Sequence, residues 1–287
     1  MLKVFYSGNG QMCNQILMQI NVLASAYEYG YKVSYRDFRM YDGFVYCDEK
    51  LNGIITAKEK GNILLKAFAV FLIKTGIRLP HFVNASDEKA VSELLQSGKL
   101  LTENYYIYHW PFNDLTSLRK HAALIRNYFS PNEDMKKYIS EKRRLYKQQG
   151  DDLIIGVHIR RKDYITWQNG AYYYNDQVYK KFMDMMYCQV KANAGSVKFL
   201  LFSDEKLDIN SFNGGGYEVF IENGSAMQDF CMLANCDYLI SPPSTFSGLA
   251  SFLGNVSRFI IADKDDELTL ERCHVWLMET DGWINPI

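Results

Sequence analysis

The chain has 287 residues, 48% of them hydrophobic, which is enough to bury the core of one large domain or of two smaller ones that share a cleft. Its 32 basic and 33 acidic residues give a net charge of −1. So weak an overall charge argues against a nucleic-acid partner, because any attraction for a polyanion would have to come from a local cluster of cations.

The cysteines and the N-terminus bear on the cellular compartment. The apolar run that begins the chain is too short for a signal peptide. Six cysteines are present without CxxC spacing, so we expect reduced thiols rather than zinc ligands or disulfides. They are Cys13, Cys47, Cys188, Cys231, Cys236 and Cys273. We therefore expect a cytoplasmic protein.

The first half of the chain predicts a βαβ unit of a parallel sheet. A strand over 2–6, a glycine turn at 8–10, a helix over 13–29 ended by Gly30, and a strand over 31–35 follow in order. Two helices over 114–129 and 132–149 are separated by Pro131, and residues 150–152 are the expected linker.

Residues 63–79 form the most apolar stretch of the chain, interrupted by Lys66 and Lys74. It falls short of the ~20 residues that span a bilayer. One interpretation is a mostly buried helix, which we favour. The alternative is a helix that lies on the inner face of the cell membrane as a peripheral contact, with Lys66, Lys74 and Arg78 facing anionic headgroups.

The alternation of strands and helices restarts after residue 150. Strands are predicted over 153–159, 197–202, 217–221, 238–240 and 259–262, and helices over 174–192, 226–235 and 246–253. The chain should therefore have an α/β fold with two Rossmann-like, doubly wound halves, residues 1–150 and 151–287. Ligands of such sheets bind outside the carboxyl ends of the strands.

One strand end is unusually charged. The run Leu153–Ile159 is continuously apolar, as in a parallel strand covered on both faces, and His158, Arg160, Arg161 and Asp163 lie at or just past its end. A guanidinium there could bind a diphosphate and stabilise its negative charge as it leaves. The alternative is a structural network in which both arginines and the aspartate close a loop.

Two other strand ends carry polar side chains: Ser203 and Asp204 in the first, and Ser244, Thr245, Phe246 and Ser247 in the second. The Asp204 carboxylate could accept hydrogen bonds from a nucleoside. The second group begins a helix, where backbone N–H groups and hydroxyls form an anion site. For each group alone, helix capping is the simpler interpretation.

The N-terminal turn and an acidic triplet are weaker signals. Gly8-x-Gly10 lacks the third glycine of a dinucleotide fingerprint, and no P-loop is present. Asn14 and Gln15 at the following helix start could bind a sugar or phosphate, or could cap the helix. The DxD triplet at 263–265 is typical of metal sites in sugar-nucleotide enzymes, but a solvated acidic loop is the better interpretation.

Taken together, these motifs resemble a known family. The segment His158-x-Arg160-Arg161-x-Asp163 resembles the HxRRxD motif shared by α1,2-, α1,6- and protein O-fucosyltransferases, and "FLLFSDE" resembles their FSDD strand end. The stretches "NGQMCNQILMQINVLASAYEYG" and "DFCMLANCDYLISPPSTFSGLASFLG" are similar to blocks of the bacterial α1,2-fucosyltransferases, glycosyltransferase family 11.

This resemblance implies a GT-B-like fold whose halves face a cleft, with GDP-fucose held by the second half and a glycan acceptor, which can be lipid-linked, by the first. It implies an inverting transfer, α1,2-linked, in surface polysaccharide or oligosaccharide synthesis, without a metal or other cofactor. The donor site would comprise Asn14, Gln15, Arg161, Ser203, Asp204, Ser244, Thr245, Phe246 and Ser247.

The same resemblance places the catalytic residues. Arg160 would contact the donor diphosphate and His158 would shape the same strand end. Asp163 is the first candidate for the base, with Asp37 and Asp42 as alternatives. The chain departs from the family at Gly248-Leu249, where paired tryptophans are usual, and this leaves the acceptor and linkage open. The rival functions are a GT-B transferase for another nucleotide sugar and a non-catalytic nucleotide or glycan binder.

Overall fold

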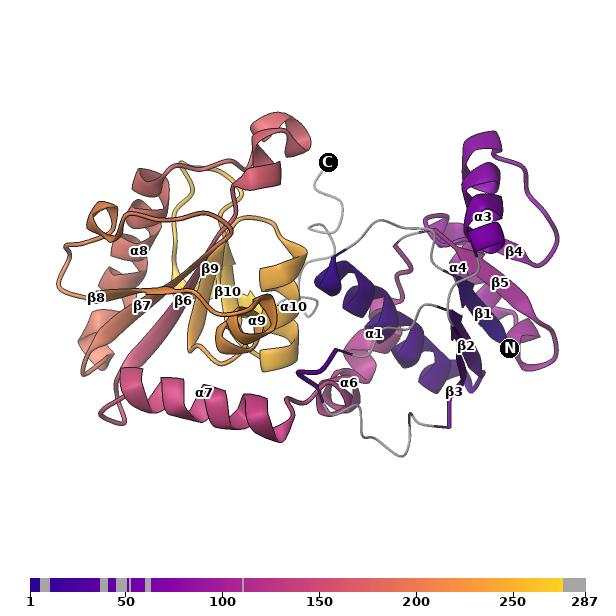
Figure 1. The fold of residues 1–287 in the computed structure, drawn as a ribbon, viewed down its shortest axis with the longest axis horizontal. Helices are drawn as coiled ribbons and strands as arrows, with labels where there is room; N and C mark the ends of the chain where they lie inside the picture. Colours follow the sequence, from indigo (N-terminus) through magenta and orange to yellow (C-terminus); the bar gives the residue numbers. More distant parts are fainter. Residues whose placement is uncertain are drawn as a thin grey trace. The chain divides into compact units, whose positions relative to one another are not determined.

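The computed structural model describes residues 1–5, 11–36, 41–44, 51, 53–59, 63–109 and 111–275. The chain divides into two compact units, Met1–Ser130 and Pro131–Ile287 (Figure 1). Each unit is built around a largely parallel sheet with its own buried core, as the sequence predicts.

The first unit contains a five-stranded parallel sheet with strand order β3-β2-β1-β5-β4. Its strands are β1 (Leu2–Phe5), β2 (Val33–Arg36), β3 (Ile55–Glu59), β4 (Phe82–Asn84) and β5 (Tyr105–Tyr108). Its helices are α1 (Met12–Tyr29), α3 (Ile63–Thr75), α4 (Glu88–Gln96), α5 (Leu115–Lys120) and α6 (Ala122–Tyr128).

The predicted βαβ unit is confirmed. Strand β1 pairs with β2 in parallel, and α1 between them buries Met18, Val22 and Ala26 against the sheet. Helix α1 ends at Gly30, whose φ of 72° is the left-handed conformation that glycine adopts most easily. The glycine turn at 8–10 lies outside the described residues.

The single helix predicted over 114–129 is instead two, α5 and α6, which meet at His121. The His121 backbone is non-helical, with φ −108° and ψ 19°. Its ring lies 4.8 Å edge-on from the Tyr27 ring, and its Nε2 lies 2.6 Å from the Glu28 carboxylate. These contacts to α1 hold the break in place, and they cannot be read from the local sequence.

Helix α3 is packed on one face only, so the favoured prediction of a mostly buried helix is wrong. Ala69 and Leu72 are buried beside Tyr108, whereas Ile63 and Phe71 are 80% and 49% exposed. Because β4 is an edge strand, nothing in the described first unit covers the outer face of the helix (Figure 1). Across the described ranges, no helix is both long and apolar enough to cross a bilayer.

The second unit contains a six-stranded sheet with order β11-β10-β9-β6-β7-β8, in which only β11 is antiparallel. Its strands are β6 (Leu153–Ile159), β7 (Val197–Ser203), β8 (Glu218–Glu222), β9 (Tyr238–Ser241), β10 (Ser257–Ile260) and β11 (His274–Val275). Its helices are α7 (Glu133–Tyr146), α8 (Asp176–Val190), α9 (Ala226–Leu233) and α10 (Thr245–Gly254).

Strand β6 is covered on both faces, as its continuous apolar run predicts. Ile155, Val157 and Ile159 belong to the core that includes α8. The alternate residues point to the other face, where an added Cβ at Gly156 would lie 2.8 Å from the Leu233 side chain of α9. His158 faces the same way and lies beside Phe246 of α10.

The second unit begins at Pro131 rather than after Gly150, where the sequence analysis placed the boundary. Helix α7 belongs to the second unit because side chains of the helix and of its C-terminal cap form ion pairs and a hydrogen bond with residues of that unit. Lys142 pairs with Glu222 at 2.7 Å, Tyr146 donates a hydrogen bond to the same carboxylate, and Lys147 lies 3.0 Å from Asp237. These partners are far away in the sequence, so the proline was the better marker of the boundary.

Candidate functional site

The sheet of the second unit has a topological switch point. From β6 the chain continues to β7 and β8 on one side, and then returns to β9 and β10 on the other. The crevice outside the carboxyl ends of β6 and β9 is where doubly wound sheets bind ligands. Arg160 follows β6 directly, and the loop at Ser244 follows β9. The predicted residues are therefore gathered at the expected edge.

Arg160 is held between two carboxylates. Its Nε lies 2.8 Å from one oxygen of Asp163, its Nη2 donates to the other at 3.1 Å, and its Nη1 lies 3.0 Å from Asp204. Burial alone would lower the pKa of Arg160, but the two carboxylates outweigh it and raise the pKa. The side chain is 23% exposed, so this permanent cation is oriented and can still be reached by a ligand.

The neighbouring Arg161 has a different environment. Its guanidinium pairs with Asp176 in the first turn of α8, and its side chain is only 13% exposed. Its backbone N–H donates to Asp204 at 3.1 Å. The sequence left open that these arginines form a structural network rather than a ligand site. The Arg161 side chain has that structural role, and the backbone of the same residue helps to orient Asp204.

His158 is a neutral residue of the site wall. It is 5% exposed, and its ring centroid lies 5.1 Å from that of Phe246. Burial, together with the nearby charges of Arg160 and Arg258, lowers the pKa of His158 to about 3. At ordinary pH the ring is therefore uncharged, and the positive charge near it comes from the guanidinium groups of Arg160 and Arg258.

Arg258 is a buried cation that the sequence analysis did not identify. It lies on β10, is 2% exposed, and its Nη1 donates to the Ser244 carbonyl at 3.3 Å and to the Ser247 hydroxyl at 3.2 Å. Burial lowers its pKa to about 9, so it stays mostly charged near neutral pH. An arginine inside the apolar run "VSRFII" was the available sequence signal.

The start of α10 combines helix capping with an exposed hydroxyl position. Ser244 accepts a hydrogen bond from the Phe246 backbone N–H at 3.2 Å, so the capping interpretation is correct for this residue. Ser247 is fully buried and its hydroxyl bonds to Ser241 at 2.8 Å, which makes it a packing residue. Thr245 is partly exposed in the first turn and is the hydroxyl here best placed for an anion.

Tyr164 joins the loop after β6 to the loop before α10. Its side chain is buried, and its hydroxyl donates to the carbonyl oxygen of Pro243. Its ring centroid lies 4.7 Å from that of Trp167. Because Tyr164 is next to Asp163, this contact also positions the carboxylate that holds Arg160. The motifs of the sequence did not point to Tyr164, and the aromatic spacing in "DYITW" was its available signal.

Of the remaining predicted residues, Ser203 lies at the same edge of the second sheet, and the others belong to the first unit. The Ser203 hydroxyl accepts from the Glu205 backbone N–H at 3.1 Å, beside Asp204. Asn14 and Gln15 lie on α1 in the first unit, where Gln15 accepts a hydrogen bond from Tyr41 at 2.9 Å. Of the alternative bases, Asp42 is exposed in the first unit, whereas Asp37 lies outside the described residues.

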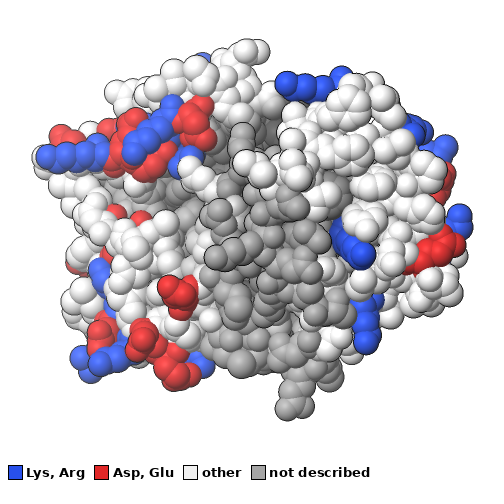
Figure 2. Space-filling view, turned by 45° about the vertical axis from the view of Figure 1, so that its right-hand side comes forward, with Lys and Arg blue, Asp and Glu red and all other residues white. Residues whose placement is uncertain are grey.

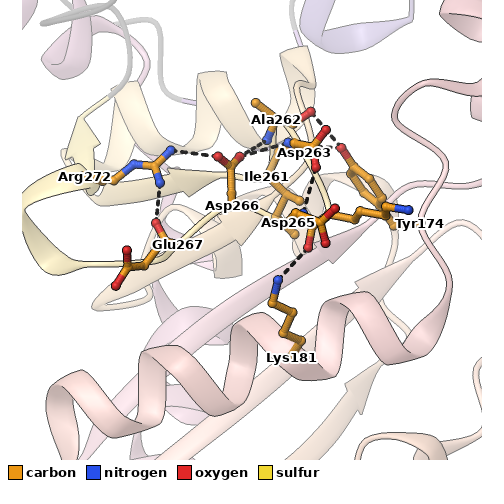
Figure 3. A network of polar contacts seen from close by, with 10 residues as sticks. Tyr174, Lys181, Ile261, Ala262, Asp263, Asp265, Asp266, Glu267 and Arg272 are labelled. Atoms are coloured by element: carbon orange, nitrogen blue, oxygen red, sulfur yellow. Dashed lines mark hydrogen bonds and ion pairs between the residues drawn. The ribbon is translucent and has the colours of Figure 1, made fainter.

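The acidic triplet forms a turn (Figure 3). Asp263 accepts from the backbone N–H of Asp265 at 2.8 Å, and Asp266 accepts from those of Ala262 and Asp263 at 3.1 and 2.9 Å. Arg272 pairs with Asp266 at 3.1 Å. Among the residues that the structure describes, no cluster of His, Cys, Asp and Glu is arranged to hold a metal ion.

Comparison with known proteins identifies the family. The model of "Glycosyl transferase family 11" matches residues 58–274, which is most of the chain and includes all of the β6 edge described above. The chain belongs to glycosyltransferase family 11. No curated protein matches the sequence significantly.

Solved structures agree on the fold of this family 11 member. A mutant of FUT1 from Arabidopsis thaliana in complex with GDP has a TM-score of 0.60 at 12% identity, over 95% of this chain and 73% of that one. POFUT1 in complex with GDP-fucose has a TM-score of 0.54 at 11% identity, over 88% of this chain and 93% of that one. The α-1,6-fucosyltransferase NodZ, soaked with GDP-fucose, has a TM-score of 0.51 at 18% identity, over 95% of this chain and 96% of that one. The predicted GT-B-like α/β fold is therefore confirmed.

Proposed function

We propose that this family 11 glycosyltransferase transfers fucose from GDP-β-L-fucose to a hydroxyl of a glycan, with inversion at the anomeric carbon. The observation that carries this proposal is the Arg160 guanidinium, oriented by two carboxylates at the switch point of the second sheet. It is supported by the family match and by the solved structures with the same fold, which were determined with GDP or GDP-fucose.

Arg160 has hydrogen-bonding capacity left for a diphosphate. Nη2 donates one hydrogen bond to Asp163, whereas Nε and Nη1 only lie within ion-pair distance of Asp163 and Asp204. Nη1 and Nη2 carry two hydrogens each, so each has an N–H to offer a ligand. That pair of N–H groups can bind phosphate oxygens in the bidentate manner that guanidinium favours. Thr245 and the backbone N–H groups of the first turn of α10 take the other phosphate.

The transfer step moves charge toward these groups. The oxygen of the acceptor hydroxyl attacks C1 of fucose and gives its proton to a carboxylate base or to water. The bond from C1 to the phosphate oxygen breaks, and GDP leaves with the bonding electrons. Arg160 stabilises the charge that develops on the diphosphate, and the buried Arg258 behind the α10 loop adds positive potential. Since the residues themselves supply this charge, we propose that neither a metal nor another cofactor takes part.

Asp163 could serve in two ways that an experiment separates. Both of its oxygens contact Arg160, so it positions the guanidinium, and it would have to give up part of that contact to take the acceptor proton. We therefore assign it the positioning role. Asp163→Asn should raise KM for the donor severalfold and lower kcat less than the ~10²–10⁴-fold expected for loss of a general base. A loss confined to kcat would restore the base assignment.

The finer assignments follow from the family resemblance. We propose an α1,2 linkage and a galactoside-like acceptor, which can be lipid-linked, in the synthesis of a surface polysaccharide or oligosaccharide. Asp204, beside Ser203 at the end of β7, meets the ribose or guanine of the donor. Linkage analysis of the product formed on a galactoside acceptor tests this assignment, and a product joined through another hydroxyl would contradict it.

A panel of nucleotide sugars tests the proposed donor. GDP and GDP-fucose should raise the melting temperature more than UDP-sugars do, because a ligand that binds only the native state stabilises it. Slow hydrolysis of GDP-fucose without acceptor, and faster GDP release with acceptor, should accompany this shift. Preference for a UDP-sugar would assign another donor, and tight GDP-fucose binding without turnover would make the protein a binder.

A further inference from the structure

The outer face of α3 concentrates the exposed apolar side chains of the molecule. Of the eleven large apolar side chains that are exposed in the described part of the chain, six lie between residues 63 and 79. They are Ile63, Leu64, Val70, Phe71, Ile77 and Leu79. Contiguous apolar surface of this kind on a folded protein marks an interaction site more often than chance exposure.

The helical period explains why the four of these side chains that lie on α3 share a face, while Ile77 and Leu79 follow the helix. Ile63, Val70 and Lys74 are separated by seven and four residues, so they form one stripe along α3, and Phe71 extends it sideways. The opposite stripe packs on the sheet through Ala69 and Leu72. The helix is therefore anchored to β4 and β5 on one side and presents an apolar ridge on the other.

The charged side chains within this stretch of the sequence have one sign. From Gly61 to Ser86 the sequence contains no Asp or Glu, and it contains Lys66, Lys74 and Arg78. Lys74 is exposed in the last turn of α3. The Arg78 side chain is 90% exposed, and its pair with Asp87 is a surface ion pair of the weak, solvated kind. Figure 2 brings this side of the molecule forward and shows a largely uncharged surface with scattered basic groups and some acidic ones at its edge.

We propose that the outer face of α3 docks the protein on an anionic lipid surface. Apolar side chains beside cations match the acyl boundary and headgroups of such a membrane, where each Lys or Arg strengthens binding by about fivefold. With thirteen residues, α3 can lie in the interface but is too short to cross it. A protein partner is less well matched, because the ridge offers few groups for directional hydrogen bonds.

Co-sedimentation of the full chain with vesicles tests the proposal. The protein should bind vesicles of phosphatidylcholine mixed with phosphatidylglycerol, bind pure phosphatidylcholine more weakly, and lose affinity as salt rises. The double variant Ile63→Asp/Phe71→Asp should bind at least about tenfold less. Lys74→Glu changes the local charge by two units and should bind about 25-fold less. An acidic side chain in the first turn of a helix is compatible with the helix dipole, so the change at position 63 should leave α3 intact.

Matched controls come from α7, far along the chain in the second unit. Leu145 is 61% exposed and Lys137 is exposed, so Leu145→Asp and Lys137→Glu change similar side chains outside the ridge and should bind like the wild type. Cooperative thermal unfolding of each variant verifies that it is folded.

Three outcomes would overturn the proposal. The first is that the wild type stays unbound with both kinds of vesicle. The second is that Ile63→Asp/Phe71→Asp and Lys74→Glu bind as well as the wild type does. The third is self-association, seen by light scattering, that the ridge variants abolish while vesicle binding is absent, which would assign the ridge to a second copy of the chain.

Discussion

Two charged strand ends of the second sheet look alike in the sequence and differ in the structure. "RRKD" follows β6 and "ADKDDE" comes shortly after β10. After β6, Arg160 is oriented by Asp163 and Asp204 and keeps N–H groups that donate to no residue in the described part of the chain. After β10, Asp263 and Asp266 accept backbone hydrogen bonds within their own turn. Charge alone therefore does not indicate a ligand site; spare hydrogen-bonding capacity at a switch point does.

Replacing Arg160 should produce the largest effect. Arg160→Ala removes the cation that we assign to the diphosphate, so kcat/KM for transfer from GDP-fucose should fall by about 10²–10³-fold or more. Arg160→Lys keeps the charge without the paired donors and should recover only part of this loss. Initial rates of GDP release provide the measurement. If folded Arg160→Ala turned over as fast as the wild type, Arg160 would have no role in transfer. The end of β6 would then be no more a ligand site than the turn after β10.

The second prediction separates adjacent arginines. Arg161→Met leaves Asp176 without its largely buried partner and should lower the free energy of unfolding by about 1–3 kcal/mol in urea titrations. GDP affinity of the folded variant should change little. Asp176→Asn on this background should restore part of the stability. Unchanged stability with weaker GDP binding would instead assign Arg161 to the donor.

The third prediction concerns acid. The pKa of His158 is about 3 in the folded state and about 6.5 when unfolded, so between these values the unfolded chain binds more protons and stability falls as the pH falls. The slope from this residue is up to about 1.4 kcal/mol per pH unit. Urea titrations from pH 7 to about 4 should show a flatter dependence for His158→Phe than for the wild type or the exposed-site control His81→Asn. Equal slopes would contradict the buried, neutral histidine.

The smallest effect is expected at the acidic turn. Asp263→Asn/Asp265→Asn keeps an acceptor for the turn but removes the charges that a divalent cation needs. Transfer rates should stay within about twofold of the wild type, with and without a chelator. A large loss that added Mn²⁺ or Mg²⁺ modulates would mean that the β10 end is also a working site.

Much of the architecture was predictable because it depends on local pattern. The continuous apolar run of β6, the helix that ends at Gly30, and the alternation of strands and helices indicate parallel sheets, and strand ends then place Arg160 at the ligand edge. The two arginines could not be distinguished in this way. Their difference depends on Asp176, which α8 brings to Arg161 from a distant part of the chain.

The same physical limit explains the other differences. Ser247 and Thr245 look equivalent in sequence, but the helix turns one into the core and leaves the other partly exposed. Arg258 and Tyr164 act through the Ser244 and Pro243 carbonyls, and no side-chain motif records a backbone partner. The outer face of α3 is exposed because β4 is an edge strand, and strand order is a property of the assembled sheet.

The most direct test of the central claim compares GDP with GMP by calorimetry, in the wild type and in Arg160→Ala. If the guanidinium after β6 binds the diphosphate, the wild type should prefer GDP by at least about tenfold, and most of that preference should disappear in the variant while GMP affinity changes little. An undiminished preference for GDP in folded Arg160→Ala would contradict the claim.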